Sequence, residues 1–424
     1  MTVLIAGAGL AGLSLGLTLH QIGVPFRIYE AVQEVKPLGV GINLQPNAVR
    51  ELFDLGLEAE LAKIGVQTRD YGFYTKTGLE VWTEPRGRWA GYDWPQYSVH
   101  RGKLQMLLYE TLVARAGGDC IITGQRAVGF ENKESGVELQ LEDGATGARS
   151  SVLGTLLVAA DGIHSAIRKQ IRPGEGEPIW GGAVLWRATT MAKPILSGAS
   201  MAMAGHDTQR FVTYPISNPD PETGLAMINW IAELTYDPSQ GWNKEDWNRE
   251  AHRNDFLPSF KDWSFHWIDV PALIANAETV FEYPMVDRDP IDQWTQGNTS
   301  LMGDAAHPTY PVGSNGASQA IVDGRVIGSK VLEHGVTPEA LNAYEADVRP
   351  LTEKIILANR GSGPDAIMQM VEDRCGGVFD NIEDVLPKQE LADHAARYKS
   401  LAGFSIDALN NQPDLIPKEK RVVG

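Results

Sequence analysis

The first thirty residues constrain the fold more than any other part of the chain. Residues 3–6 (Val-Leu-Ile-Ala) form a short apolar run, typical of a strand that is buried on both faces of a parallel sheet. This run leads into a G-x-G-x-x-G motif at 7–12, and a leucine-rich helical pattern follows and ends near Gly23. A second strand is expected at 26–30, with Glu30 at its end. The stretch therefore predicts a strand–turn–helix–strand unit.

Each part of this unit has a physical role in binding a dinucleotide. Gly7 permits the tight turn, Gly9 has no side chain to hold a pyrophosphate away from the backbone, and Gly12 lets the helix pack closely on the sheet. The phosphates would lie at the N-terminus of the helix, where free N–H groups favour negative charge. Glu30 can accept both hydroxyls of an adenosine ribose, and Ala31 after it does not favour a 2′-phosphate. The motif alone leaves FAD and NAD as alternatives.

Two later stretches repeat the pattern of a buried strand followed by an acidic loop. Residues 156–160 form an apolar run that ends in Asp161-Gly162, just before a predicted helix. Residues 299–302 lead into Gly303-Asp304, and a loop rich in glycine then opens a further helix. An acidic residue and a glycine between a strand and a helix are typical of anion and ribose binding.

The three motifs, in this order and spacing, resemble the class A FAD-dependent aromatic hydroxylases, the group of para-hydroxybenzoate and salicylate hydroxylases. The resemblance implies an α/β fold with a Rossmann-like FAD-binding domain of the glutathione-reductase type, an inserted antiparallel β-sheet domain that binds substrate, and C-terminal helices. We expect the FAD-binding domain at 1–75, 96–175 and 278–360, the substrate domain at 76–95 and 176–277, and C-terminal helices and a tail at 361–424.

The resemblance also implies which residues hold a tightly bound, non-covalent FAD. Gly7, Gly9 and Gly12 would hold the pyrophosphate and Glu30 the ribose. Further along the chain, the expected contacts are Gly41, Arg101 with Gln105 one helical turn later, Asp161 for FAD and the nicotinamide cofactor, Asp304 for the ribityl chain, Gly313, Asn315, Gly316 and Ala317 at the flavin's pyrimidine edge, and Pro311, whose carbonyl would face both flavin and substrate.

Four stretches, at 37–43, 96–102, 283–290 and 354–360, look like the phenazine-hydroxylating branch of this family. That branch includes the 5-methylphenazine-1-carboxylate 1-monooxygenases, which hydroxylate with loss of a carboxylate. Because these stretches mostly shape the flavin domain, they indicate a branch better than they indicate a substrate.

The chemistry implied by the resemblance belongs mainly to the cofactor. NADH or NADPH reduces FAD, and the reduced flavin captures O2 as a C4a-hydroperoxide that transfers OH to an aromatic or N-heteroaromatic ring. The protein supplies orientation and a dry cavity. No second G-x-G-x-x-G motif is present, which fits a family in which the nicotinamide cofactor binds only transiently. The residues do not choose between NADH and NADPH, nor do they name a general base.

Between 176 and 277, short alternating strands are expected at 183–188, 210–214 and 225–231. Trp186, Met203, Tyr214 and Trp230 are candidates for the substrate pocket, and the core of the sheet is an equally good alternative for each. Arg187 could pair with a substrate carboxylate, although a solvated or structurally paired arginine is the commoner case. His164 and His307 are expected to be structural.

Composition narrows the classes of partner and compartment. The formal net charge of −17 argues against nucleic acid or an anionic membrane as a partner. No stretch approaches the roughly 20 apolar residues of a membrane span, and two cysteines suit a reducing, cytoplasmic compartment without a metal cluster. We expect a monomer or a homodimer with a small aromatic substrate.

Two alternatives remain, namely a non-oxygenating flavoenzyme, such as a reductase or a halogenase, and a flavin-binding sensor. Residues 229–232 do not match the W-x-W-x-I-P run of halogenases.

Overall fold

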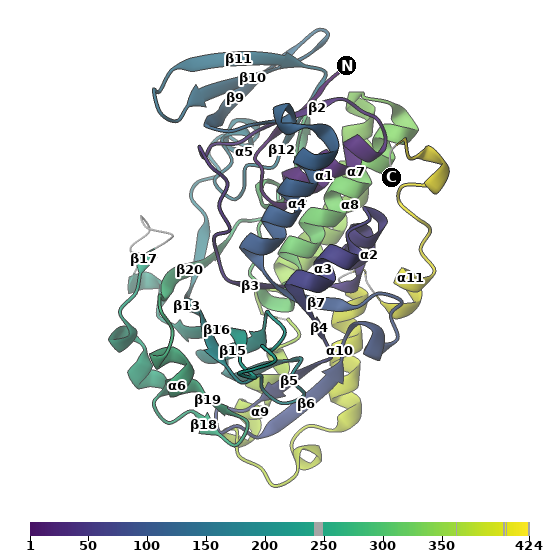
Figure 1. Ribbon diagram of the computed structural model, residues 1–424. Coiled ribbons are helices and arrows are strands. Elements are labelled where there is room, and N and C mark those ends of the chain that lie inside the picture. The colour runs from purple at the N-terminus through teal and green to yellow at the C-terminus, as the bar shows by residue number, and fades with distance from the viewer. Residues whose placement is uncertain (241–248, 362, 402, 404, 423–424) are drawn as a thin grey trace.

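The computed structural model describes residues 1–240, 249–361, 363–401, 403 and 405–422 (Figure 1). Within these residues, six strands form a central sheet in the order β21-β22-β12-β1-β2-β8, parallel except for the β21–β22 pair. Their bounds are β1 Val3–Ala6, β2 Phe26–Tyr29, β8 Ile121–Ile122, β12 Leu156–Ala159, β21 Thr295–Gln296 and β22 Thr299–Leu301.

Helices cover this sheet and complete one hydrophobic core. Helix α1 packs against α7 and α4, and α7 packs in turn against α8 and α2 (Figure 1). The helix that follows the β12 loop is α5, and a short helix α3 lies against α4. The bounds of these helices are α1 Leu10–Gln21, α2 Pro46–Asp54, α3 Glu58–Ile64, α4 Arg101–Ala116, α5 Ala166–Ile171, α7 Gly316–His334 and α8 Pro338–Ala358.

Two small antiparallel sheets flank the central one. The first, in the order β3-β7-β4, leads into α4, and the second, β11-β10-β9, forms the upper edge of the molecule in Figure 1. Their strands are β3 Gly41–Leu44, β4 Gly65–Thr68, β7 Gln96–His100, β9 Gln125–Lys133, β10 Gly136–Asp143 and β11 Arg149–Gly154.

The lower half of the molecule is a sheet of eight described strands, in the order β17-β20-β13-β16-β15-β14-β5-β6. All pairs are antiparallel except β14–β5. The hairpin β5–β6 joins it from early in the chain, so the sheet already begins at Asp70, ahead of the boundary at 76 that the sequence suggested. The strands are β5 Asp70–Tyr74, β6 Glu80–Pro85, β13 Ile179–Ala192, β14 Ser200–His206, β15 Gln209–Pro215, β16 Ala226–Thr235, β17 Arg249–Glu250 and β20 Phe281–Asp287.

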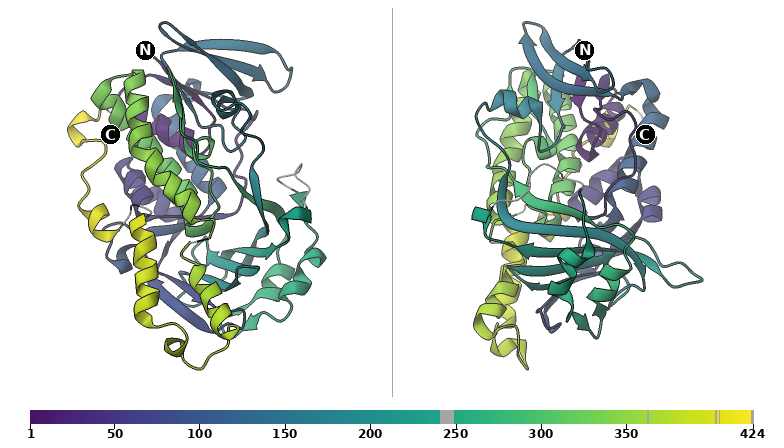
Figure 2. Two further views of the ribbon diagram at one scale, coloured as in Figure 1. Left: turned by 180° about the vertical axis from the view of Figure 1, so that it is seen from behind. Right: turned by 90° about the vertical axis from the view of Figure 1, so that its left-hand side faces the viewer.

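The two faces of the eight-stranded sheet carry different cores. On one face, helix α6 Val270–Ala275 and the short pair β18 Ser264–Phe265 and β19 Ile268–Asp269 enclose an aromatic core. On the other face, the C-terminal helices α9 Ala366–Cys375 and α10 Lys388–Leu401 pack against β5, β14 and β15 (Figure 2). After α11 Ile406–Asn410, the chain returns to the upper half, where the Val422 amide donates to Gln21 O at 2.8 Å.

The predicted elements agree with the structure where the pattern is local. The expected strands at 3–6, 26–30, 156–160 and 299–302 are β1, β2, β12 and β22, and the α/β fold class is confirmed. Helix α8 is a single helix that runs unbroken through Pro350. Packing of α8 against α7 outweighs the single backbone hydrogen bond that a proline removes.

A buried arginine fastens the third strand-end loop to the second. Arg168 of α5 is 1 % exposed, and its Nη1 donates to Ala305 O at 3.0 Å and to Ala306 O at 2.7 Å. Its Nε donates to the Glu175 carboxylate at 2.8 Å. The carbonyls that follow Asp304 are therefore fixed by a side chain of α5, the helix that follows the loop after β12.

We predict that Arg168→Leu lowers the free energy of unfolding by about 3–5 kcal/mol, because it leaves buried carbonyls and part of a buried ion pair without a partner. Arg172→Leu, at the end of the same helix, is the control, since Arg172 is half exposed and pairs at 3.2 Å with exposed Asp292. Urea unfolding of both variants gives the comparison. Equal unfolding free energies for the two would contradict the prediction.

Candidate active site

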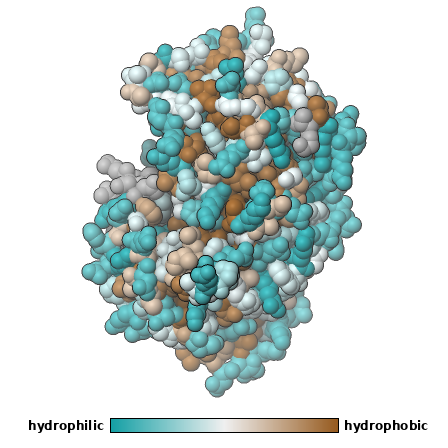
Figure 3. Space-filling model, viewed as in Figure 1, coloured by the Kyte–Doolittle hydropathy of each residue, from teal (hydrophilic) through white to brown (hydrophobic). Residues whose placement is uncertain are grey.

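A cavity of about 450 Å3 lies between the central sheet and the eight-stranded sheet. On the side of the central sheet it is lined by the glycine-rich turn, the strand ends and the first turn of α7, and on the other side by β13, β14, β15, β16 and β20. The cavity therefore lies where all three sequence motifs meet the substrate sheet. On the outer surface of the molecule, hydrophilic side chains cover most of the face seen in Figure 3, with hydrophobic patches between them.

The glycine-rich turn has the geometry that a close ligand requires. Gly7 has φ +101°, and a Cβ on Gly12 would lie 2.0 Å from Gly7 O, so a side chain at Gly12 would clash with the turn. In contrast, a Cβ on Gly9 would meet nothing within 4 Å, and Gly9 lines the cavity. The turn is thus packed on its sheet side and open on its cavity side.

Two residues that were predicted to bind FAD form hydrogen bonds with the backbone of Ala8, which lies between Gly7 and Gly9. The Ala8 amide donates to Glu30 Oε2 at 2.6 Å, and Gln105 Nε2 donates to Ala8 O at 2.9 Å. Gln105 lies one turn into α4, whose first residue is Arg101 and whose N-cap is His100, with Nδ1 accepting from the Gly102 amide at 3.1 Å. Arg101 lines the cavity and makes no ion pair with any residue in the described ranges. Glu30 and Gln105 themselves lie outside the cavity lining.

Asp161 follows β12 and lies between two lining residues, Ala160 and Gly162. Its Oδ2 accepts from the Ala166 amide at 3.1 Å, whereas its buried Oδ1 has no partner among the described residues. Burial raises the pKa of the Asp161 carboxyl to about 6, against the opposing effect of the hydrogen bonds from Ser165 and from backbone amides. An unsatisfied carboxylate oxygen at this position fits a hydroxyl-bearing ligand.

Asp304 lines the cavity directly, and its carboxylate accepts no hydrogen bond from a described residue. The exposed part of the Asp304 side chain faces this cavity. The surrounding protein desolvates the carboxyl group and raises its pKa. Behind it, the Gly303 amide and His307 Nε2 both bind Asp323 Oδ2, at 3.0 Å and 2.6 Å. Burial alone would lower the pKa of His307, but the charge of Asp323 and its hydrogen bond raise it. His307 is structural, as expected.

The loop before α7 lines the cavity through Pro311, Gly313, Gly316 and Ala317. Gly313 has φ +74° and Ser314 φ +57°, so the loop turns through two left-handed residues before Asn315 caps the helix. Gln45 holds this turn, with Nε2 donating to Gly313 O at 3.1 Å and its backbone amide donating to Ser318 Oγ at 2.9 Å. The free N–H groups of the first turn of α7 face the cavity side, which favours negative charge there.

Gly41 joins the two halves of the molecule. Its amide donates to Asn229 Oδ1 at 2.7 Å, and its carbonyl accepts from Arg187 Nη2 at 3.2 Å. A Cβ on Gly41 would lie 2.6 Å from Asn229 Cγ and 2.8 Å from the Tyr214 ring. Only glycine therefore lets β3 approach the substrate sheet this closely.

Of the two cations of the substrate sheet that line the cavity, Arg187 and Arg210, it is Arg187 that lacks a carboxylate partner within the described residues. Besides its bond to Gly41, its guanidinium lies 5.8 Å from the centre of the Tyr283 ring, and its buried Nε has no partner there. Burial lowers the pKa of Arg187, and Arg101 lowers it further. By contrast, Arg210 in the same cavity pairs with Asp207 at 2.6 Å and with Asp365 at 2.8 Å.

Two of the four pocket candidates do not line the cavity. Trp186 stacks on Phe256 at 4.8 Å and its Nε1 donates to Glu282 at 2.9 Å, while Trp230 donates to Thr190 at 3.0 Å. Both lie in the core on the α6 face, because successive residues of a strand point to opposite faces of its sheet. Met203 and Tyr214 do line the cavity.

Sequence reasoning missed several lining residues of the substrate sheet. Leu185 flanks Trp186, and Ile231 flanks Trp230, so the alternation that starts at Arg187 would have found both. Others lie in strands that carried a candidate, such as Met201 beside Met203 and Val212 beside Tyr214, or in ranges assigned to the FAD-binding domain, such as Tyr71. These are Tyr71, Met201, Arg210, Val212, Glu233, Tyr283 and Met285.

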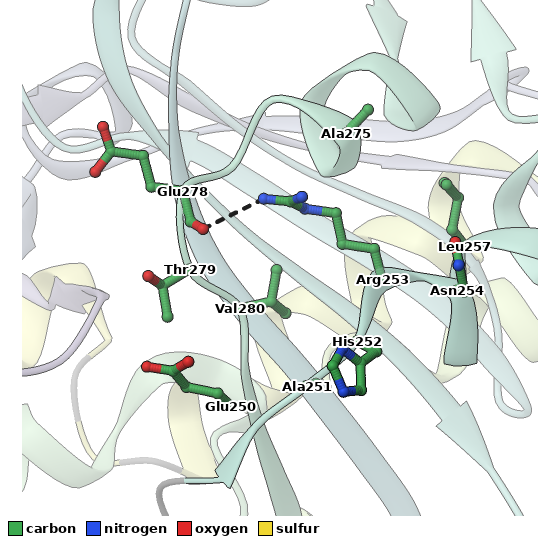
Figure 4. Close-up of a pocket in the computed structure, with 10 residues that line it drawn as sticks. All are labelled: Glu250, Ala251, His252, Arg253, Asn254, Leu257, Ala275, Glu278, Thr279 and Val280. Atoms are coloured by element: carbon green, nitrogen blue, oxygen red, sulfur yellow. Dashed lines mark hydrogen bonds between the residues drawn. The ribbon is translucent and has the colours of Figure 1, made fainter.

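A second hollow, of about 430 Å3, lies beside β17 and contains none of the motif residues (Figure 4). Arg253 reaches across it and donates to the carbonyl oxygens of Ala277 and, at 3.3 Å, of Glu278. In the described part of the chain, no group of three or more His, Cys, Asp or Glu side chains is placed to hold a metal ion. Nor does any described helix have the length and apolar character to cross a membrane.

Comparison with known proteins agrees with this geometry. Residues 1–358 match the family model described as "FAD binding domain". The chain is 42% identical to phenazine 1,6-dicarboxylic acid hydroxylase PhzS of Lysobacter antibioticus, over 84% of this chain and 89% of that protein. It is 31% identical to the aurachin C monooxygenase/isomerase of Stigmatella aurantiaca, over 82% of this chain and 84% of that protein.

A similar fold is seen in the crystal structure of Klebsiella pneumoniae HpxO complexed with FAD and uric acid, with a TM-score of 0.73, 22% identity and coverage of 97% of each chain. Length, motif order and fold all agree. The chain belongs to the FAD-binding-domain family and is an FAD-dependent aromatic monooxygenase of the class A hydroxylase group.

Proposed function

We propose that this monooxygenase uses NADH or NADPH and O2 to hydroxylate an aromatic or N-heteroaromatic carboxylic acid, with or without loss of the carboxylate. The observation that carries the proposal is Arg187, a largely desolvated cation that lines the cavity without a carboxylate partner among the described residues. Leaving such a charge unpaired is costly, and a substrate carboxylate would remove the cost. Its planar guanidinium suits a bidentate contact with a carboxylate.

The cavity supports this choice of ring and acid. Tyr214, Met203, Leu185 and Ile231 provide apolar surface for a flat ring, and Arg187 lies in the same wall. A relative with 42% identity is named for a dicarboxylic acid of phenazine, which is an N-heteroaromatic acid. The size and lining of the cavity support the same class of substrate here.

We propose that the FAD site comprises three groups of residues. Gly7, Gly9 and Gly12 would take the pyrophosphate, with Glu30 and Gln105 fixing the turn and Glu30 also reaching the ribose. Arg101 and Asp304 would bind the phosphate and ribityl region, and Asp161 the ribose or the visiting nicotinamide cofactor. The pyrimidine edge would lie against Gly41, Pro311, Gly313, Asn315, Gly316 and Ala317.

Bound FAD supplies hydride acceptance from NAD(P)H and activation of O2. The residues of this chain orient and shield the reaction. Arg187 would hold the acid group, the N–H groups that open α7 would stabilise negative charge at the pyrimidine edge, and the carbonyl of Pro311 would face the ring to be hydroxylated. Closure of the cavity by the substrate sheet would exclude water.

Within this proposal the ranges 1–75, 96–175 and 278–360 bind FAD, except for β5 and β20, which belong to the eight-stranded sheet that binds substrate. We further propose a cytoplasmic monomer or homodimer that does not bind nucleic acid. The net charge of −17 supports the last point, and two free cysteines support a reducing compartment.

A substrate panel tests the function. The purified holoenzyme is incubated with NADH or NADPH and a set of benzoates, hydroxypyridine carboxylates and phenazine carboxylates, each beside its uncharged amide. We expect acids to stimulate NAD(P)H oxidation and O2 uptake and to gain one oxygen atom, or to exchange carboxylate for hydroxyl. Oxidation of NAD(P)H without an oxygenated product from any acid would contradict the proposal.

Asp304→Ala should release FAD, because it removes the carboxylate that faces the ribityl region. We expect the FAD dissociation constant to rise at least about tenfold, because one charge-assisted hydrogen bond to FAD is lost. Flavin absorbance relative to protein after gel filtration measures it. Asp292→Ala, on the exposed surface, is the control. Full flavin occupancy in Asp304→Ala would show that the Gly303-Asp304 motif has been assigned wrongly.

Arg187→Met should lower kcat/KM for the acid substrate by about a hundredfold, since a buried charge-assisted pair contributes several kcal/mol. The uncharged amide of the same ring should be affected far less. Arg187→Lys should recover only part of the loss, because an ammonium lacks the bidentate fork. Lys193→Met, one residue beyond the end of β13, is the control. An equal loss for acid and amide would assign Arg187 to structure instead.

A further inference from the structure

One wall of the substrate cavity is thin. Tyr71 of β5 and Met201 of β14 line the 450 Å3 cavity on one side and a polar cavity of about 20 Å3 on the other. The two residues are paired in register across β5 and β14. The small cavity behind them is also lined by Glu84, Arg86, Gln96 and Lys399. Tyr71 and Met201 therefore separate the two cavities.

Three charged side chains form a series of ion pairs beside the Tyr71 ring. Glu84 of β6 lies directly opposite Tyr71 in the β5–β6 register, so the two side chains share a face of the hairpin. Arg86 lies over the Tyr71 ring, 5.0 Å from its centre, and its Nη2 is 2.6 Å from Glu84 Oε1. The other carboxylate oxygen of Glu84 accepts from Lys399 Nζ at 2.8 Å.

These charges are largely buried and depend on one another. The side chains of Glu84 and Arg86 are 8% and 10% exposed, and that of Lys399 is 19% exposed. Burial alone would raise the pKa of Glu84, but Arg86 and Lys399 together lower it. Without Lys399, one oxygen of a buried carboxylate loses its cation, and Arg86 is left as the remaining partner. Such groups reorganise rather than stay buried unpaired.

Lys399 belongs to a part of the chain that lies beyond the family match, which ends at residue 358. Its helix, α10, packs with α9 on the same face of the substrate sheet as the lining residues Tyr71 and Met201. Apolar residues of this segment share one core with Tyr71, Met203 and Tyr214; they are Ile367, Met368, Val371, Leu386 and Leu391. The C-terminal helices thus pack beside the cavity, on the face of the sheet that lines it.

We propose that Lys399 is a positioning residue for the substrate cavity, holding the Tyr71 ring against bound substrate through Glu84 and Arg86. The proposal rests on the proposed function, since it assigns the back wall of that same site. Lys399 does not line the large cavity. It lines the small one, together with Gly313 and Ser314 of the loop before α7. Its loss should let the ring retreat into the space behind it, which enlarges the cavity and loosens the substrate.

The test compares Lys399→Met with wild-type holoenzyme, using the best acid substrate of the panel. We expect KM to rise about threefold to tenfold, the size of a typical coupling between contacting residues, with a smaller change in kcat. A loosely held ring should also raise the share of NAD(P)H and O2 converted to NAD(P)+ and H2O2 without hydroxylation. Lys399→Arg should restore both KM and coupling, and the affinity for FAD should not change.

Lys388→Met is the matched control, because Lys388 begins the same helix and its 75% exposed side chain pairs only loosely with Glu383 at 3.7 Å. Glu84→Gln provides a second variant with near-identical shape and should reproduce the rise in KM even if Lys399→Met folds poorly. In a Tyr71→Ala background, Lys399→Met should have no further effect on KM.

Three results would overturn the assignment: unchanged KM and coupling in both Lys399→Met and Glu84→Gln, equal effects of Lys388→Met, or full additivity with Tyr71→Ala. These outcomes are separate from failure of the proposed function, which would appear as absence of oxygenated product in the wild-type protein. A fall in melting temperature without a change in KM or coupling would likewise reduce Lys399 to a structural role.

Discussion

The parallel pairing of β1 with β12, and of β12 with β22, is the constraint on which the site depends. In register, Ala6 lies beside Ala159, and Ala159 beside Leu301, so the three strands end at one edge of the sheet. The glycine turn, Asp161 and Asp304 follow those ends and come together although they are far apart in sequence. Two buried side chains then fix the third loop: Arg168 binds the carbonyls after Asp304, and Asp323 binds the Gly303 amide.

The eight-stranded sheet adds a second constraint, because each of its strands serves two environments. Along β13, Leu185 and Arg187 face the cavity, while Trp186 between them packs in the aromatic core. The Arg187 guanidinium on the cavity face is desolvated by the surrounding protein. The charge of Arg210 is balanced by carboxylates of the protein, whereas that of Arg187 is not. This contrast within one cavity favours an anionic ligand at Arg187.

Local patterns were enough to predict the strand-end motifs, because a G-x-G-x-x-G turn and its flanking strand and helix are specified by adjacent residues. The sequence left the facing of Trp186 and Trp230 open, since each is large and apolar and either face would accept it. Alternation fixes their facing only once Arg187 is known to face the cavity and β13 to pair with β16. Membership of β5 in the substrate sheet was missed because it pairs in parallel with β14, far along the chain. Arg187 was identified as a candidate, but its lack of a partner depends on the positions of every acid around it.

The wall of the cavity around Tyr71 depends on residues that are distant in the sequence. The flavin-facing side is built from residues before 358, whereas the Tyr71 wall is supported by Lys399 and by apolar side chains of α9 and α10. The two sides meet at the small cavity, which Lys399 lines together with Gly313 and Ser314 of the loop before α7. Because Glu84 must remain paired in its buried position, changes in the C-terminal helices act on the ring through charge and not only through packing.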